Sequence, residues 1–229
     1  MMWKPISEPM VLDLPLNLSQ DVFAAWIPVK QTVPRDPLPK LTGVPFLNER
    51  ESSTFKIAKR CEEHAAGRWL LAWCLRRVGL DPDSFTLERD EYRKPWLVGP
   101  SAPAVSISHS GGLAMVAIAV GRDTIGIDVE PLVERKRGIL DFLCTPSEST
   151  SLEEKWDSDP NAASEMTNRL WVCKEAIQKA VGKGMGITPC SIEIGDLDSA
   201  VVEGEQYAVS QWTTVLNGMA TAVAISMKA

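Results

Sequence analysis

The feature that most constrains the fold of this 229-residue chain is an arrangement that occurs twice, a helical segment followed by strand-like runs. The first helix is predicted over residues 62–78, because apolar residues recur there at helical spacing and Gly79 can supply a C-terminal cap. The pattern indicates the α+β class. The apolar face of this helix consists of Ala66, Trp69, Leu70, Trp73 and Cys74.

The second long helix is predicted to begin at Asp159-Pro160 and to reach about Val181. Another helix is predicted to begin before it, because Thr145-Pro146-Ser147-Glu148 has the pattern of a capping box with proline in the first turn. The proline-rich residues 34–45 are not expected to hold regular structure for long. Strands are predicted at residues 22–29, 85–88, 104–108, 113–120, 124–130, 191–194, 206–213 and 219–226.

Two short internal similarities relate the halves of the chain. Residues 76–79 (RRVG) resemble residues 179–182 (KAVG), and residues 115–119 (MVAIA) resemble residues 222–226 (AVAIS). Matches this short also arise by chance. If they are real, they indicate two related α+β lobes, residues 1–120 and 121–229.

Charge and composition restrict the possible partners. The formal net charge is −6, so general binding of nucleic acid is not expected. The basic runs at residues 76–77 and 135–137 are either local clusters for a polyanionic small molecule or solvated faces. The five cysteines include no CxxC pair, so no zinc site is indicated. No apolar run has the length of a membrane span and residues 1–20 lack a signal-peptide core, which predicts a soluble, cytoplasmic protein.

Carboxylates in residues 125–130 form the first candidate site. Read as a strand, this segment points three apolar side chains toward the core and leaves Asp128 and Glu130 on the other face with Gly126. The two carboxylates then lie roughly 7 Å apart, close enough to share Mg²⁺ with substrate oxygens. The alternative is a half-exposed strand with its polar residues outward. The apolar side chains are those of Ile125, Ile127 and Val129.

Charged residues of the second long helix form another candidate site. Glu175, Lys179 and Lys183 are spaced i, i+4 and i+8, opposite a predicted buried stripe. They are either a solvated face with a weak ion pair, or a third carboxylate for a metal with lysines placed to meet phosphates. The buried stripe consists of Leu170, Cys173, Ile177 and Val181.

A third candidate is the segment 106–112, which reads SISHSGG. Its hydroxyl groups, its glycine-rich backbone and His109 suit a phosphate, although His109 can also be an incidental loop residue. A serine hydrolase is not favoured because no GxSxG occurs, and the chain also lacks a Walker loop and a GxGxxG motif. The tripeptide at 94–96 (KPW) is too short to be specific alone.

Taken in order, these segments resemble the 4′-phosphopantetheinyl transferase superfamily, in its larger, surfactin-synthetase-activating type. The resemblance runs from about Arg60 to Gly186 and rests on residues 94–96 (KPW), 106–112 (SISHSGG), 126–130 (GIDVE) and 171–184 (WVCKEAIQKAVGKG). It implies two similar lobes related by a pseudo-twofold axis, each a helix packed on a small, mostly antiparallel sheet. It also implies a coenzyme A site between the lobes. Departures from the family pattern are Trp96, where tyrosine is frequent, and Leu143-Cys144, where phenylalanine and serine are frequent.

The resemblance also implies roles for individual residues. Asp128, Glu130 and Glu175 match the acids that bind Mg²⁺. The residues that match coenzyme A contacts are Lys94, Ser108 and His109 at the phosphates, Lys174 and Lys179 near the pyrophosphate, and Arg68 at the nucleotide.

The implied activity is transfer of the 4′-phosphopantetheine arm of coenzyme A to a serine of an acyl or peptidyl carrier protein. Mg²⁺ and lysines offset charge on the transferring phosphoryl group, and Glu175 accepts the serine proton directly or through water. Asp128, Glu175 and Lys179 are thus the expected catalytic residues, in a chain that acts as a monomer. The alternatives are a Mg²⁺-dependent hydrolase of another nucleotide pyrophosphate and a non-catalytic relative that binds coenzyme A or a carrier.

Overall fold

The structure is a computed structural model that describes residues 2–16, 18, 22–33 and 35–229. The chain forms two compact units. Unit 1 comprises residues 1–88 and 95–122, and unit 2 comprises residues 89–94 and 123–229. Lys94, which the sequence placed before residue 120 in the N-terminal lobe, therefore groups with unit 2.

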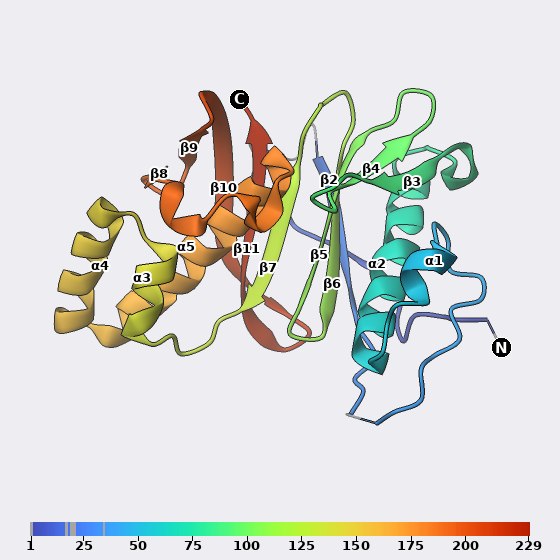
Figure 1. The fold of residues 1–229 in the computed structure, drawn as a ribbon, viewed down its shortest axis with the longest axis horizontal. Coiled ribbons are helices and arrows are strands. Elements are labelled where there is room, and N and C mark those ends of the chain that lie inside the picture. The colour runs from blue at the N-terminus through green and yellow to red at the C-terminus, as the bar shows by residue number, and fades with distance from the viewer. Residues whose placement is uncertain (1, 17, 19–21, 34) are drawn as a thin grey trace. The chain divides into compact units, whose positions relative to one another are not determined.

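Unit 1 contains a four-stranded antiparallel sheet in the order β1-β2-β6-β5, with helix α2 packed against it (Figure 1). A separate two-stranded sheet pairs β3 with β4. The elements are β1 (Met10–Val11), β2 (Val22–Pro28), α1 (Glu49–Ser52), α2 (Ala58–Arg77), η1 (Pro82–Ser84), β3 (Thr86–Arg89), β4 (Pro95–Val98), β5 (Ala104–Ser110) and β6 (Leu113–Ala119).

The core of unit 1 lies between α2 and the sheet. Ala66, Leu70 and Cys74 are buried there, as their helical spacing predicted, and they pack with strand residues such as Ile27 and Val116. The helix begins four residues before the predicted residue 62, and its C-cap is Val78. Gly79 follows with φ of 80°, a conformation that glycine adopts without strain.

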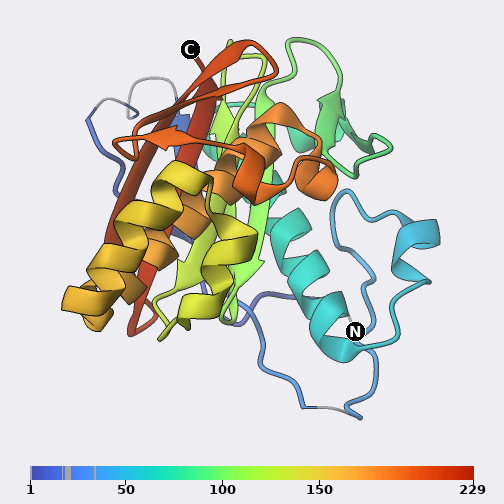
Figure 2. The same ribbon diagram turned by 60° about the vertical axis from the view of Figure 1, so that its left-hand side comes forward.

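Unit 2 contains a five-stranded antiparallel sheet in the order β7-β11-β10-β9-β8. The long helix α5 packs on this sheet, and α4 lies alongside α5 (Figure 2). The elements are β7 (Gly126–Pro131), η2 (Arg137–Ile139), α3 (Leu140–Leu143), α4 (Pro146–Ser158), α5 (Pro160–Val181), η3 (Gly184–Gly186), η4 (Pro189–Ser191), β8 (Ile194–Gly195), β9 (Ser199–Val202), β10 (Glu205–Leu216) and β11 (Met219–Lys228).

Both predicted helix starts in unit 2 are confirmed. Thr145 caps α4 and forms a capping box with Glu148, and the Asp159 carboxylate accepts the Ala162 N–H at the start of α5. The end of α5 is also sharp, because its C-cap, Gly182, has φ of 93°. Lys183 therefore lies beyond the helix, so the predicted i+8 spacing from Glu175 is not helical.

The strands of unit 2 differ from prediction in three places. The strand predicted at residues 191–194 is observed only from Ile194, because Ser191 belongs to a 3₁₀ turn. Strand β9 was not predicted at all. The hairpin of β10 and β11 is longer than expected and turns at Asn217-Gly218, which have φ of 49° and 77°. An Asn-Gly pair between two apolar runs is a strong sequence signal for such a hairpin.

The α+β class is confirmed by this mixture of helices and antiparallel sheets. The pseudo-twofold relation between lobes stays a prediction. No helix in the described part of the chain is long and apolar enough to cross a bilayer.

Candidate active site

The position of the candidate acids depends on how closely α5 approaches β7. Gly126, at the start of β7, faces α5: a Cβ atom there would clash with the Ala176 carbonyl oxygen and lie 2.5 Å from the Ala180 nitrogen. A glycine is therefore required for this approach. Because strand side chains alternate, Asp128 and Glu130 lie on the same α5-facing side as Gly126.

The apolar residues of β7 occupy the opposite face. Ile127 and Val129 are fully buried, as predicted, but they are not part of the hydrophobic cluster beneath α5. That cluster instead includes Ala222 and Ala224 of β11, the register partners of Glu130 and Asp128. The carboxylates consequently lie at the edge of a packed helix–sheet interface rather than on an open, solvated strand.

Helix α5 brings Glu175 and Lys179 to these carboxylates. Lys179 Nζ donates to Asp128 Oδ1 at 2.6 Å, and the Asp128 side chain is only 4% exposed whereas that of Lys179 is 27% exposed. A carboxylate removed from water in this way needs a charged or hydrogen-bonding partner. Lys179 supplies one, in a charge-assisted hydrogen bond.

Glu175 shares the same electrostatic environment. Burial raises the pKa of Glu175 above its ordinary value; Lys179 lowers this pKa, and the carboxylates of Asp128 and Glu130 raise it. Each of these effects requires the groups to be near one another. The structure therefore gathers the three predicted acids and Lys179 in one part of unit 2. Their metal-binding and catalytic roles remain predictions.

The chemistry of these acids fits a hard divalent cation. Carboxylate oxygens are the ligands that Mg²⁺ prefers, and it is usually held by one or two of them together with substrate phosphates. Among the described residues, however, no three His, Cys, Asp or Glu side chains are already arranged around a common metal position. The Lys179 ammonium already contacts Asp128 in this structure.

Lys174 is placed differently from the sequence expectation, which put it near the pyrophosphate. Its side chain is 0% exposed, and Nζ contacts Glu148 Oε2 at 2.5 Å and the carbonyl oxygens of Leu143 at 2.8 Å and Pro189 at 3.1 Å. These three acceptors use all three donors of an ammonium group. Lys174 therefore cross-links α3, α4, α5 and η4 and has no donor left for a phosphate.

Lys94 lies at the C-terminal end of α5. Its Nζ donates to the Ala180 carbonyl oxygen at 2.8 Å, and a Cβ on Gly182 would lie 2.5 Å from Lys94 Cδ. Burial lowers the pKa of Lys94, and Asp90 opposes that shift. A cation at a helix C-terminus is favourable because it satisfies an open carbonyl group and the helix dipole. The predicted phosphate contact of Lys94 is not tested by these bonds.

The remaining predicted coenzyme contacts belong to unit 1. Ser108 is buried on β5, and His109 next to it is 37% exposed with Nδ1 3.7 Å from Glu63 Oε2. Arg68 lies on α2, 4% exposed, with its guanidinium 3.6 Å from Glu51 Oε2. The carboxylates Glu51 and Glu63 were missed by the sequence reading, since no motif marks a partner contributed by a different element.

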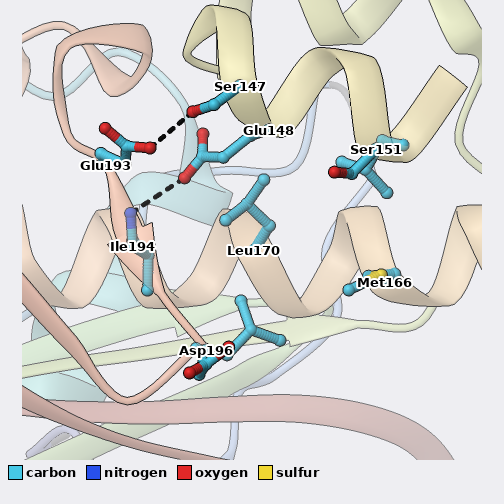
Figure 3. Close-up of a pocket in the computed structure, with 10 residues that line it drawn as sticks. Ser147, Glu148, Ser151, Met166, Leu170, Glu193, Ile194 and Asp196 are labelled. Carbon is cyan, nitrogen blue, oxygen red and sulfur yellow. Dashed lines mark hydrogen bonds between the residues drawn. The ribbon is translucent and has the colours of Figure 1, made fainter.

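A separate pocket of about 410 Å³ lies between α4, α5 and β8 in unit 2 (Figure 3). Its polar end holds Glu148, Ser147 and Glu193, where Ser147 Oγ donates to Glu193 at 2.5 Å and the Ile194 N–H donates to Glu148 at 3.0 Å. None of the predicted site residues lines it. Its lining consists of Ser147, Glu148, Ser151, Leu152, Met166, Leu170, Glu193, Ile194, Asp196 and Leu197.

Comparison with known proteins gives matches along most of the chain. The family profile of the 4′-phosphopantetheinyl transferase N-terminal domain matches residues 50–119, and that of the 4′-phosphopantetheinyl transferase superfamily matches residues 124–225. A 4′-phosphopantetheinyl transferase of Bacillus subtilis is 32% identical over 114 residues, which are 49% of this chain and 48% of that relative. The chain thus spans about half the length of the curated relative it matches.

Proposed function

The chain belongs to the 4′-phosphopantetheinyl transferase superfamily, and on this basis we propose that it transfers the 4′-phosphopantetheine arm of coenzyme A to a carrier protein. The acceptor is a serine hydroxyl of an acyl or peptidyl carrier protein, and the reaction depends on Mg²⁺. The observation that carries the proposal is the gathering of Asp128, Glu130, Glu175 and Lys179 where α5 meets β7. The larger, surfactin-synthetase-activating type remains the proposed subtype.

The proposed step is a phosphoryl transfer. The serine oxygen forms a bond to the phosphorus that carries the pantetheine arm, and the bond from this phosphorus to the bridging pyrophosphate oxygen breaks. The leaving group is 3′-phosphoadenosine 5′-phosphate. Glu175 takes the serine proton; burial raises its pKa above the ordinary value, which favours proton acceptance. Such a base contributes about 10²- to 10⁴-fold.

A divalent cation bound by Asp128, Glu130 and Glu175 would offset the negative charge that builds on the phosphoryl oxygens. Cationic side chains of the protein supply the remaining positive charge at the phosphates. Lys179 is partly exposed and can point its ammonium toward the pyrophosphate. Lys94, Ser108 and His109 are the proposed phosphate contacts, and Arg68 is the proposed nucleotide contact. Lys174, whose ammonium is held in a buried cross-link, is not among the proposed contacts.

One assay tests the proposal against its alternatives. The protein is incubated with coenzyme A, Mg²⁺ and an apo carrier protein, and the carrier is weighed by mass spectrometry. A carrier heavier by one phosphopantetheine supports the transferase. Cleaved coenzyme A with an unchanged carrier would instead identify a hydrolase. Intact coenzyme A with an unchanged carrier would indicate a protein that binds coenzyme A or a carrier without catalysis. The Asp128→Asn and Glu175→Gln variants serve as matched controls that keep side-chain volume and lose the charge.

A further inference from the structure

We propose that the pocket between α4, α5 and β8 binds a small organic cation. The ammonium or guanidinium group of this ligand lies beside Glu193 and Asp196, and its apolar chain lies against Met166. The pocket belongs wholly to unit 2, and none of the residues assigned to the transfer reaction lines it. The site is therefore independent of the proposed function.

The pocket has the size and the apolar wall of a small-molecule site. Its volume of about 410 Å³ lies within the range of about 300–1,000 Å³ that is usual for such sites. Leu152 of α4 and Leu170 of α5 line it and are each 3% exposed. Met166, one turn before Leu170, is 40% exposed. A thioether side chain adapts to ligands of different shape, and covering it removes apolar surface from water.

The acidic side chains of the pocket determine the charge of its ligand. Three carboxylates line it, those of Glu148, Glu193 and Asp196. The charge of Glu148 is already compensated by the Lys174 ammonium. Glu193 accepts a hydrogen bond from the neutral Ser147 hydroxyl, and a carboxylate has room for further donors. Among the residues that the structure describes, no lysine or arginine pairs with Glu193 or Asp196, so two negative charges face the ligand.

An organic cation fits this pocket better than a metal ion. No three His, Cys, Asp or Glu side chains in the described part of the chain are arranged around a common metal position, so these carboxylates are not a preformed metal site. Figure 3 shows Glu193 at one end of the pocket and Ser151 and Met166 at the other. A metal ion would use only the acidic end, whereas an ammonium group on an apolar chain would use both ends.

The acidic end is held in place before any ligand binds. Ser147 Oγ donates to Glu193 at 2.5 Å, and the Ile194 N–H donates to Glu148 at 3.0 Å, so side chains of α4 connect to residues 193 and 194 (Figure 3). Lys174 fixes Glu148 from the other side, since its ammonium contacts the same carboxylate. A ligand therefore has little ordering of the protein to overcome at this end.

The test is the binding of hexylamine, whose ammonium group keeps its charge at pH 7 as lysine does. Affinity is measured by calorimetry, and the site is located by amide chemical shifts of the whole chain, without coenzyme A or a carrier. Hexan-1-ol has the same chain without the charge, and ammonium chloride has the charge without the chain. We expect hexylamine to shift amides around Met166 and Ile194 and to bind about tenfold more tightly than either control, since each control loses one set of contacts.

A double variant tests the two acids. Glu193→Gln with Asp196→Asn keeps the size of both side chains, and asparagine tolerates the φ of 47° at residue 196. We expect this variant to bind hexylamine about tenfold more weakly or worse. Glu154→Gln with Glu165→Gln is the matched control, because both residues are exposed, lie on α4 and α5 and do not line the pocket. Its affinity should equal that of the wild type.

Several results would overturn the proposal. One is the absence of saturable hexylamine binding up to about 10 mM, and another is amide shifts that lie away from the pocket. Equal affinity for hexylamine and hexan-1-ol would remove the role of the charge. An equal loss in the two double variants would reduce the effect to net charge. The comparison of ligands on the wild type keeps the question answerable if a variant does not fold.

Discussion

Replacing Lys174 by methionine should destabilise the protein severely without removing a coenzyme A contact. Methionine has a similar length and removes only the charge and the donors. Three groups then lose their contact with the ammonium: the Glu148 carboxylate, which is 11% exposed and keeps only backbone donors, and the carbonyl oxygens of Leu143 and Pro189. Breaking a buried ion pair by removing one partner costs about 3–5 kcal/mol. That is a large share of the roughly 5–15 kcal/mol by which a native protein is stable.

The free energy of unfolding is measured by urea titration with tryptophan fluorescence, on the wild type, Lys174→Met and Lys183→Met. Lys183 forms an exposed ion pair with Glu203, so its variant should unfold at the wild-type urea concentration. The KM for coenzyme A is then measured for Lys174→Met at a temperature where it stays folded. It should remain within about twofold of the wild-type value, because no charged contact to the coenzyme has been lost.

Two results would refute this reasoning. A loss of less than about 1 kcal/mol would mean that Glu148 and the two carbonyl groups find other partners at no cost. A KM raised about tenfold or more, with stability intact, would mean that Lys174 reaches a phosphate after all, since that is the effect expected from losing a charged hydrogen bond.

The remaining predictions concern the site itself. Asp128→Ala, Glu130→Ala and Glu175→Ala should each abolish most transfer while circular dichroism stays native; near-normal activity with unchanged Mg²⁺ dependence in all three would remove the metal assignment. Lys94→Ala and His109→Ala should raise the KM for coenzyme A about tenfold or more, and the His109 effect should be much smaller with 3′-dephospho-coenzyme A; an equal loss on both substrates would exclude the 3′-phosphate as its contact. Gly126→Ala should cost about 1–3 kcal/mol or more and reduce transfer, because its methyl group meets the backbone of α5, whereas Gly138→Ala, with open space around it, should be neutral.

Local signals predicted those parts of the fold that short-range chemistry controls. The capping box at Thr145 and Glu148, the Asp159 cap and the glycine after α2 each act within a few residues, so their patterns carry over to the structure. Segments whose shape depends on packing were missed, among them β9 and the 3₁₀ turn at residues 189–191.

The sequence predicted which residues belong to the site better than it predicted what these residues contact. Alternation along β7 correctly put Asp128 and Glu130 on one face, but it could not reveal that this face is the one α5 covers. The helical pattern around residue 174 likewise could not reveal which element covers that side of the helix. A single helix gives no sign that α4 will pack on its outer side, and it is this second layer that turns Lys174 from a surface lysine into a buried cross-link.

The grouping of residues 89–94 with unit 2 has a consequence for dissecting the protein. The chain passes from one unit to the other at three places, after residues 88, 94 and 122, so no single cut separates two independent pieces. A fragment that starts at Asp123 would contain every acid of the candidate site, yet it would lack Lys94 at the end of α5. Its last helical turn should fray, and hydrogen exchange of the amides near Val181 should be faster than in the whole chain. A peptide that spans β3 and β4 contains residues 89–94. Adding this peptide back should slow the exchange if residues 89–94 are what stabilises the helix end.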